Sequence, residues 1–177
     1  MQLHEDTCMC NYLSSDRRLS AYAAMNNSSG TPSARQVRVW ARLLGAQRLA
    51  LQSVECALAR AKLPPLAWYD VLLELEGAGR LGLRPYELQQ ALLLAQYNLS
   101  RLLDRIERRA CIERRECKQD GRGQVVVITE AGLALRRRMW PVYAAAIRAA
   151  FTDHLSARQV NALDSILGAL REGLRGG

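Results

Sequence analysis

Metal-binding residue types are scarce or poorly spaced in this chain of 177 residues. Only two histidines are present, His4 and His154, and the five cysteines include no Cys-x-x-Cys pair. A structural zinc site would need scattered ligands, so we expect no metal and no cofactor. An odd number of cysteines does not suit a complete disulfide framework and is compatible with a reducing compartment that keeps them as thiols.

Long apolar runs and catalytic motifs are also absent. No run approaches the roughly twenty apolar residues that span a bilayer, and the N-terminus lacks the apolar stretch of a secretory signal. We therefore expect a cytoplasmic protein with no membrane partner. Neither histidine lies in a recognisable catalytic motif, and a surface helix face explains Asp70, Glu74 and Glu76, so we do not expect an enzyme.

Positive charge, in contrast, is abundant. The formal net charge is +8 and the pI is about 9.7. Lys and Arg near phosphates release condensed counterions, so this balance favours a polyanionic partner. A solvated basic surface is the alternative interpretation, and charge alone leaves it open.

The hydrophobic pattern predicts a mainly α chain with one β-hairpin. Residues 1–32 form an N-terminal arm that ends in turn formers. The expected helices cover residues 33–62, 66–75, 86–93, 96–109, a segment that Thr129 caps, and a last helix that begins at a capping box, Ser156-Ala157-Arg158-Gln159. The first and last helices carry apolar stripes at three-four spacing, which is typical of helices that pair.

The fourth predicted helix has two different faces. Leu99, Leu102, Leu103 and Ile106 form an apolar face, whereas Asn98 and several arginines occupy the other. Beyond it, Arg114–Lys118 and the β-branched residues 125–128 flank a turn at residues 119–123, which predicts a hairpin. A helix-turn-helix followed by a wing combines such a helix with a cationic hairpin tip, the arrangement that reads duplex DNA.

At these residues the sequence resembles the MarR family of transcriptional regulators. Residues 98–107 (NLSRLLDRIE) are similar to its recognition helix, Asp120-Gly121-Arg122 to its wing-tip Asp-x-Arg, and residues 128–132 (ITEAG) to the entry of its next helix. The family usually has Gly after the recognition helix and Ser or Thr at the starts of its DNA-facing helices. This chain has Ala110, Arg84 and Ala95 there.

The resemblance implies a winged helix-turn-helix at residues 64–129, flanked by long dimerisation helices at 33–63 and 130–177. A two-fold homodimer of this kind would bind a pseudo-palindromic operator in double-stranded DNA. We predict groove contacts for Gln96, Tyr97, Asn98 and Arg101, phosphate contacts or support for Arg105, Arg114 and Arg115, a minor-groove contact for Arg122, and a wing-orienting role for Asp120.

Many members of the family release DNA when a small ligand binds, and a small aromatic carboxylate or phenolic effector is our hypothesis here. Its predicted contacts are Arg38, Trp40, Arg42, Trp68, Tyr69 and Tyr143, although Trp40 and Trp68 could equally be core residues.

Two alternatives stay open. One is a thiol-oxidation sensor of the same fold, because arginines near Cys111 and Cys117 could favour the thiolate. The other is a winged-helix protein-interaction module that does not bind DNA.

Overall fold

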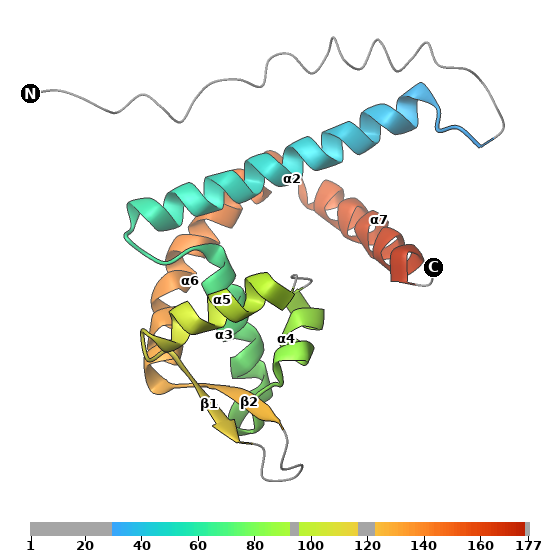
Figure 1. Cartoon of the computed structure of the whole chain (residues 1–177). Coiled ribbons are helices and arrows are strands. Elements are labelled where there is room, and N and C mark those ends of the chain that lie inside the picture. Colours follow the sequence, from blue (N-terminus) through green and yellow to red (C-terminus); the bar gives the residue numbers. More distant parts are fainter. Residues whose placement is uncertain (1–29, 93–95, 117–122, 176–177) are drawn as a thin grey trace, which may run out of the picture. The chain divides into compact units, whose positions relative to one another are not determined.

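The computed structural model describes residues 30–92, 96–116 and 123–175. For residues 96 and 97 it describes the helical backbone and not the side chains. Figure 1 shows helices and one two-stranded sheet, which confirms the predicted fold class. The helices are α2 (Ala34–Arg60), α3 (Leu66–Ala78), α4 (Pro85–Leu92), α5 (Gln96–Glu107), α6 (Glu130–Ala150) and α7 (Ala157–Arg175), with short 3-10 turns at Gly79–Leu81 and Thr152–His154.

None of the helices in the described ranges is long and apolar enough to cross a membrane. The described residues also contain no group of three or more His, Cys, Asp or Glu side chains that could hold a metal ion.

The chain divides into two compact units, Met1–Leu49 and Ala50–Gly177, and α2 runs from the first into the second. In the described part of the first unit no residue is buried, and several large apolar side chains are exposed, among them Val39 and Trp40, which exposes 60% of its surface. This part of α2 has no apolar core of its own.

The main core of the second unit joins α3, α4, α5 and the hairpin. The predicted apolar face of α5 is confirmed, since each of its four members is at most 4% exposed. Leu72 and Leu75 of α3 and Leu88 of α4 pack in the same cluster, and Val126 reaches it from the hairpin. Burial of one face therefore holds α5 in place and leaves its other face outside.

A second apolar cluster joins the end of α2 to α3 and α6. Its buried members are Val54, Leu58, Leu66, Tyr69, Met139 and Ala146. The carboxylate of Glu55 accepts a hydrogen bond of 3.1 Å from the Leu66 amide, which satisfies one of the open N–H groups at the start of α3.

Two helices end with a residue in the left-handed region. Ala110 and Lys62 both have φ of +54°. After α5, the Ala110 amide donates to the Glu107 carbonyl and the Cys111 amide donates to the Ile106 carbonyl, which is the Schellman pattern. This termination places Ala110 just after the helix, and the assigned end of α5 at Glu107 lies within two residues of the predicted end near Arg109. Ala110 adopts the conformation for which glycine is the usual residue.

The hairpin consists of β1 (Ile112–Glu116) and β2 (Gln124–Ile128), antiparallel with Ile112 opposite Ile128. Leu83 extends this sheet, because its amide donates to the Val126 carbonyl at 3.0 Å and its carbonyl accepts from the Val126 amide at 2.8 Å. A Cβ at Gly82 would lie 2.4 Å from the Val126 carbonyl oxygen. The segment before α4 is therefore fixed directly against the hairpin.

Capping interactions start the last two long helices as predicted. The Thr129 hydroxyl oxygen accepts a bond of 3.1 Å from the Gly132 amide and donates its own proton to the Ala110 carbonyl at 2.7 Å. A Cβ at Gly132 would lie 2.1 Å from the Cys111 carbonyl oxygen, so α6 begins in close contact with the chain that leaves α5. At α7, Ser156 and Gln159 form the capping box.

Candidate nucleic-acid interface

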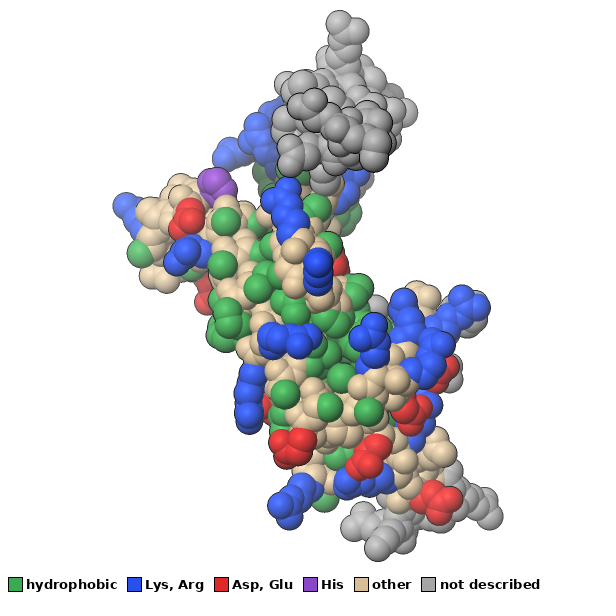
Figure 2. Space-filling view, turned by 90° about the vertical axis from the view of Figure 1, so that its left-hand side faces the viewer, with side chains coloured by type: hydrophobic (Ala, Val, Ile, Leu, Met, Phe, Trp, Pro, Cys, Tyr) green, Lys and Arg blue, Asp and Glu red, His purple; other side chains and the backbone are tan. Residues whose placement is uncertain are grey.

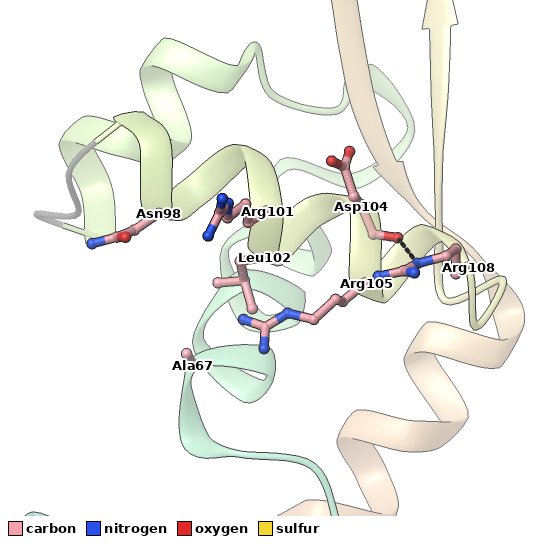
Figure 3. A pocket seen from close by; sticks show the side chains of 7 residues that line it. All are labelled: Ala67, Asn98, Arg101, Leu102, Asp104, Arg105 and Arg108. Atoms are coloured by element: carbon pink, nitrogen blue, oxygen red, sulfur yellow. Dashed lines mark hydrogen bonds between the residues drawn. The ribbon is translucent and has the colours of Figure 1, made fainter.

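The outer face of α5 is polar and strongly basic. Asn98, Arg101, Arg105 and Arg108 are exposed there, and together with Asp104, Leu102 and Ala67 of α3 they line an open groove of about 630 Å³. Figure 3 shows these side chains along one side of α5, with Arg105 extending toward α3. Predicted groove residues Asn98 and Arg101 and predicted phosphate residue Arg105 therefore share one surface.

Asp104 is the one carboxylate among the residues that line this groove, and its charge is compensated. The Asp104 carboxylate lies 2.5 Å from the Arg114 guanidinium, and the Asp104 carbonyl accepts a hydrogen bond of 3.3 Å from Arg108 Nε, the dashed line in Figure 3. With Asp104 paired to a residue outside the groove, the three arginines dominate the potential of this surface.

Arg114 lies on β1 and connects the hairpin to α5. Its guanidinium forms ion pairs with Asp104 and with Glu107, and its side chain is 26% exposed. Of the two roles predicted for Arg114, this geometry fits support of the wing. Arg115, the next residue, is paired with Glu113 on the same strand and is 55% exposed.

Four of the predicted interface residues cannot be placed. The backbones of Gln96 and Tyr97 belong to the first turn of α5, but their side chains are not described. Asp120 and Arg122 lie outside the described residues.

Sequence reasoning missed two residues that shape this surface. A Cβ at Gly123 would lie 3.6 Å from an Arg84 guanidinium nitrogen, so the Arg84 side chain lies beside the hairpin where it leaves the turn. The carboxylate of Glu87 accepts a hydrogen bond of 2.6 Å from the Arg84 amide, which is the glutamate half of a capping box. An Arg with Glu three residues later was the available signal. Similarly, Asp104 and Glu107 are spaced three apart on one helix face and could have predicted the Arg114 partner.

The predicted effector residues are divided between the two units. Tyr69 and Tyr143 meet edge to face at 5.0 Å, and Trp140, which was not predicted, lies 6.2 Å from each of them. Trp68 is buried in the other apolar cluster. Arg38, Trp40 and Arg42 belong to the first unit and are exposed.

Acidic groups surround the Tyr69 cluster. Burial raises the pKa of Asp70, and the neighbouring charges of Glu55 and Glu74 raise it further. Burial also raises the pKa of Tyr143, with added contributions from Asp70 and Tyr69. A cation lies at the same cluster: Arg136 donates a hydrogen bond of 3.4 Å to the Tyr69 hydroxyl and also pairs with Glu76.

The surroundings of Cys111 act on its thiol in opposite directions. Burial raises the pKa of the Cys111 thiol, and this outweighs the lowering by Arg109 and Arg138. The thiol donates a weak bond to the Arg109 carbonyl at 3.4 Å. Cys56 is half-buried, and Cys8, Cys10 and Cys117 lie outside the described residues.

A helix held by its buried face, exposing a basic face beside a two-stranded hairpin, defines the winged helix-turn-helix class. The MarR family model (MarR_2) matches residues 63–123. A comparison of the sequence with curated proteins found no match. Over these residues the chain matches the MarR family of transcriptional regulators.

Solved structures of this family are similar over most of the chain. The MarR-family regulator Sco3205 from Streptomyces coelicolor, solved in complex with DNA, is 29% identical with a TM-score of 0.76, and the alignment covers 84% of this chain and 93% of that one. AbsC from the same organism is 28% identical with a TM-score of 0.73, covering 84% and 100%. A mutant MarR from E. coli bound to operator DNA is 22% identical with a TM-score of 0.68, covering 79% and 99%, which supports the fold alone.

Proposed function

We propose that this chain is a cytoplasmic homodimeric repressor that binds a pseudo-palindromic operator through α5 and the hairpin and leaves it when a small aromatic carboxylate or phenolic compound binds. The observation that carries DNA binding is the basic outer face of α5, with its opposite face buried. A rigidly held helix loses little conformational freedom when it enters a groove.

In this proposal the polar side chains of α5 contact different parts of the DNA, according to their position along the helix. Gln96, Tyr97, Asn98 and Arg101, on its first two turns, contact base edges, because a recognition helix enters the major groove with its N-terminal part. Arg105 contacts phosphate. Arg122 at the wing enters the minor groove, where its potential is most negative, and Asp120 orients it.

The similarity to Sco3205 supports this function, because that protein is 29% identical to this chain and its structure was solved in complex with DNA. The same observation disfavours the alternative of an interaction module without DNA binding. An oxidation switch based on Cys111 is disfavoured because burial raises the pKa of its thiol.

The dimer is proposed from the exposed apolar residues of α7. No residue of α7 is buried, and Ile166, Leu167, Leu170 and Leu174 expose between 40% and 75% of their surface. So many exposed apolar side chains on one amphipathic helix favour cover by another surface. A second copy of this chain is the occupant we propose, and residues 33–63 and 130–177 are the proposed dimerisation region.

The experiment that tests DNA binding is an anisotropy titration of a labelled duplex from the region upstream of the gene, against a random duplex of equal length. Affinity should fall steeply with salt for both duplexes, because Lys and Arg side chains release counterions from the DNA phosphates and added salt opposes that release. The preference for the upstream duplex should persist. Arg122→Ala should weaken binding to the upstream duplex without changing the melting temperature. Equal affinity for both duplexes at every salt concentration would reject the proposed function.

A further inference from the structure

The segment that precedes α4 holds the hairpin along its second strand. Leu83 exchanges two backbone hydrogen bonds with Val126 of β2, at 3.0 and 2.8 Å. Gly82, with φ of +68°, lies so close to β2 that a Cβ there would be 2.4 Å from the Val126 carbonyl oxygen. Arg84 is the next residue, so its backbone begins at a position that is fixed on β2.

Hydrogen bonds also fix the backbone of Arg84 on the side of α4. Its amide donates to the Glu87 carboxylate at 2.6 Å, and its carbonyl accepts from the amides of Glu87 and Leu88 at 3.0 and 3.1 Å. The same carboxylate accepts a bond of 3.3 Å from the Tyr86 hydroxyl. A side chain that starts from such a constrained backbone loses less conformational freedom when it forms a contact.

The Arg84 side chain extends to the residue at which the chain leaves the hairpin turn. An ideal Cβ at Gly123 would lie 3.6 Å from a guanidinium nitrogen of Arg84 and 3.7 Å from its Cζ, which is van der Waals contact. Arg84 is half-buried, whereas Arg80 is exposed. In the sequence, Gly123 directly follows Arg122, the residue proposed to enter the minor groove. The guanidinium of Arg84 therefore packs against the residue that joins Arg122 to β2.

The contacts of Arg84 and Arg114 involve different strands of the hairpin. Arg114 lies on β1 and pairs with α5, whereas Arg84 lies before α4 and packs beside the start of β2. Positive charge alone does not single out Arg84, because Figure 2 shows Lys and Arg side chains over much of the face that it draws. The fixed backbone and the contact with Gly123 distinguish it from the other exposed or half-buried arginines.

We infer that Arg84 is a positioning residue for DNA recognition, whose guanidinium holds the start of β2 beside α4 and thereby sets where Arg122 enters the minor groove. A Ser or Thr side chain ends at Oγ, so it could not reach Gly123 as the longer Arg84 side chain does. The inference rests on the proposed function for its effect on the operator, but the contact itself can be tested without DNA.

Hydrogen exchange of the intact protein without DNA, followed by NMR, tests this contact. Arg84→Gln should speed exchange of the Val126 amide, which donates to Leu83, about fivefold, because the start of β2 opens more often. Arg80→Gln is the control and should leave this amide unchanged, since Arg80 is an exposed arginine on the preceding 3-10 turn. Unchanged exchange at Val126 in Arg84→Gln would refute the contact, whereas a wild type without preference for the upstream duplex would refute the proposed function.

A double-mutant cycle with Arg122→Ala separates positioning from direct contact with DNA. Arg84→Gln should weaken binding to the upstream duplex about tenfold when Arg122 is present, and by no more than about twofold when Arg122 is already Ala. Arg84→Lys keeps the charge without the planar guanidinium, so it should recover only part of the affinity. Arg80→Gln should stay within about twofold of wild type. Additive losses in the cycle, or full recovery by Arg84→Lys, would show a phosphate contact of Arg84 itself and would overturn the positioning role.

Discussion

Arg114→Gln should remove the ion pairs that connect the hairpin to α5 and leave the core folded. The Arg114 guanidinium joins Asp104 and Glu107 of α5, and the side chains of Arg114, Asp104 and Glu107 are 26%, 56% and 35% exposed. Pairs of this exposure contribute roughly 0.5 kcal/mol each, so the variant should lose about 1 kcal/mol of stability. It also leaves two uncompensated carboxylates on or beside the proposed DNA surface.

Binding should therefore fall more than stability suggests, because phosphate repels the exposed carboxylates. We expect about tenfold weaker binding to the upstream duplex. Poorer positioning of the wing, at about 1 kcal/mol, would account for about fivefold of this loss, and repulsion between the carboxylates and phosphate for the rest. Urea unfolding at fixed protein concentration measures the stability and anisotropy measures the affinity. Arg115→Gln is the control for the stability measurement, since Arg115 is more exposed and pairs only with Glu113 among the ion pairs described.

A double-mutant cycle with Asp104→Asn isolates the contact. The two changes should be non-additive by a few tenths of a kcal/mol or more in stability, and Arg114→Gln should harm DNA binding less when Asp104 is already neutral. Strict additivity of both quantities would refute the proposed connection between wing and helix.

Three further predictions follow from the described contacts. Gly132→Ala should destabilise the protein by about 2 kcal/mol or more in urea unfolding, because its Cβ would lie 2.1 Å from the Cys111 carbonyl oxygen. Gly77→Ala is the control and should be neutral or stabilising, because Gly77 lies on a helix with open space around it. Equal effects of the two substitutions would contradict the packing. Burial raises the pKa of Asp70, so the folded state binds this proton more tightly than the unfolded state and loses stability as the pH rises through the raised pKa. The stability of Asp70→Asn relative to wild type should therefore increase between pH 4 and pH 7. A stability difference between the two proteins that stays constant with pH would contradict this. Leu170→Glu should convert the proposed dimer to monomer in sedimentation experiments, while Ser165→Glu on the same helix should not, and an intact dimer in both would exclude α7 from the interface.

Much of the fold was predictable because the signals were local. The apolar spacing of α5, the Thr129 cap and the Ser156 capping box each depend on residues within a few positions, and all three were confirmed. The end of α5 was predicted to within two residues, but its left-handed termination at Ala110 was not predicted, because glycine is the usual residue in that conformation. The closing contacts around it, between Thr129, Gly132 and the Ala110–Cys111 segment, join residues about twenty positions apart.

The candidate site was predictable only in part. Which face of α5 is exposed followed from periodicity, but the pairing of Arg114 with Asp104 and Glu107 is a tertiary contact. Of the predicted effector residues, Trp68 is a core residue, because aromatic residues in amphipathic positions also build cores. The groups of residues that line one cavity depend on how α6 packs against the end of α5, which spacing along the chain does not reveal.

The most direct test of the central claim compares Arg105→Gln with Arg137→Gln in binding to the upstream duplex over a range of salt concentrations. Both substitutions remove one exposed positive charge, but only Arg105 lies on the outer face of α5. Arg105→Gln should weaken binding and reduce the slope of log affinity against log salt by about 0.9, the value for one lost phosphate contact, while Arg137→Gln should change neither beyond a small uniform effect. Equal affinities and slopes for the two variants would contradict a DNA-binding role for this face of α5.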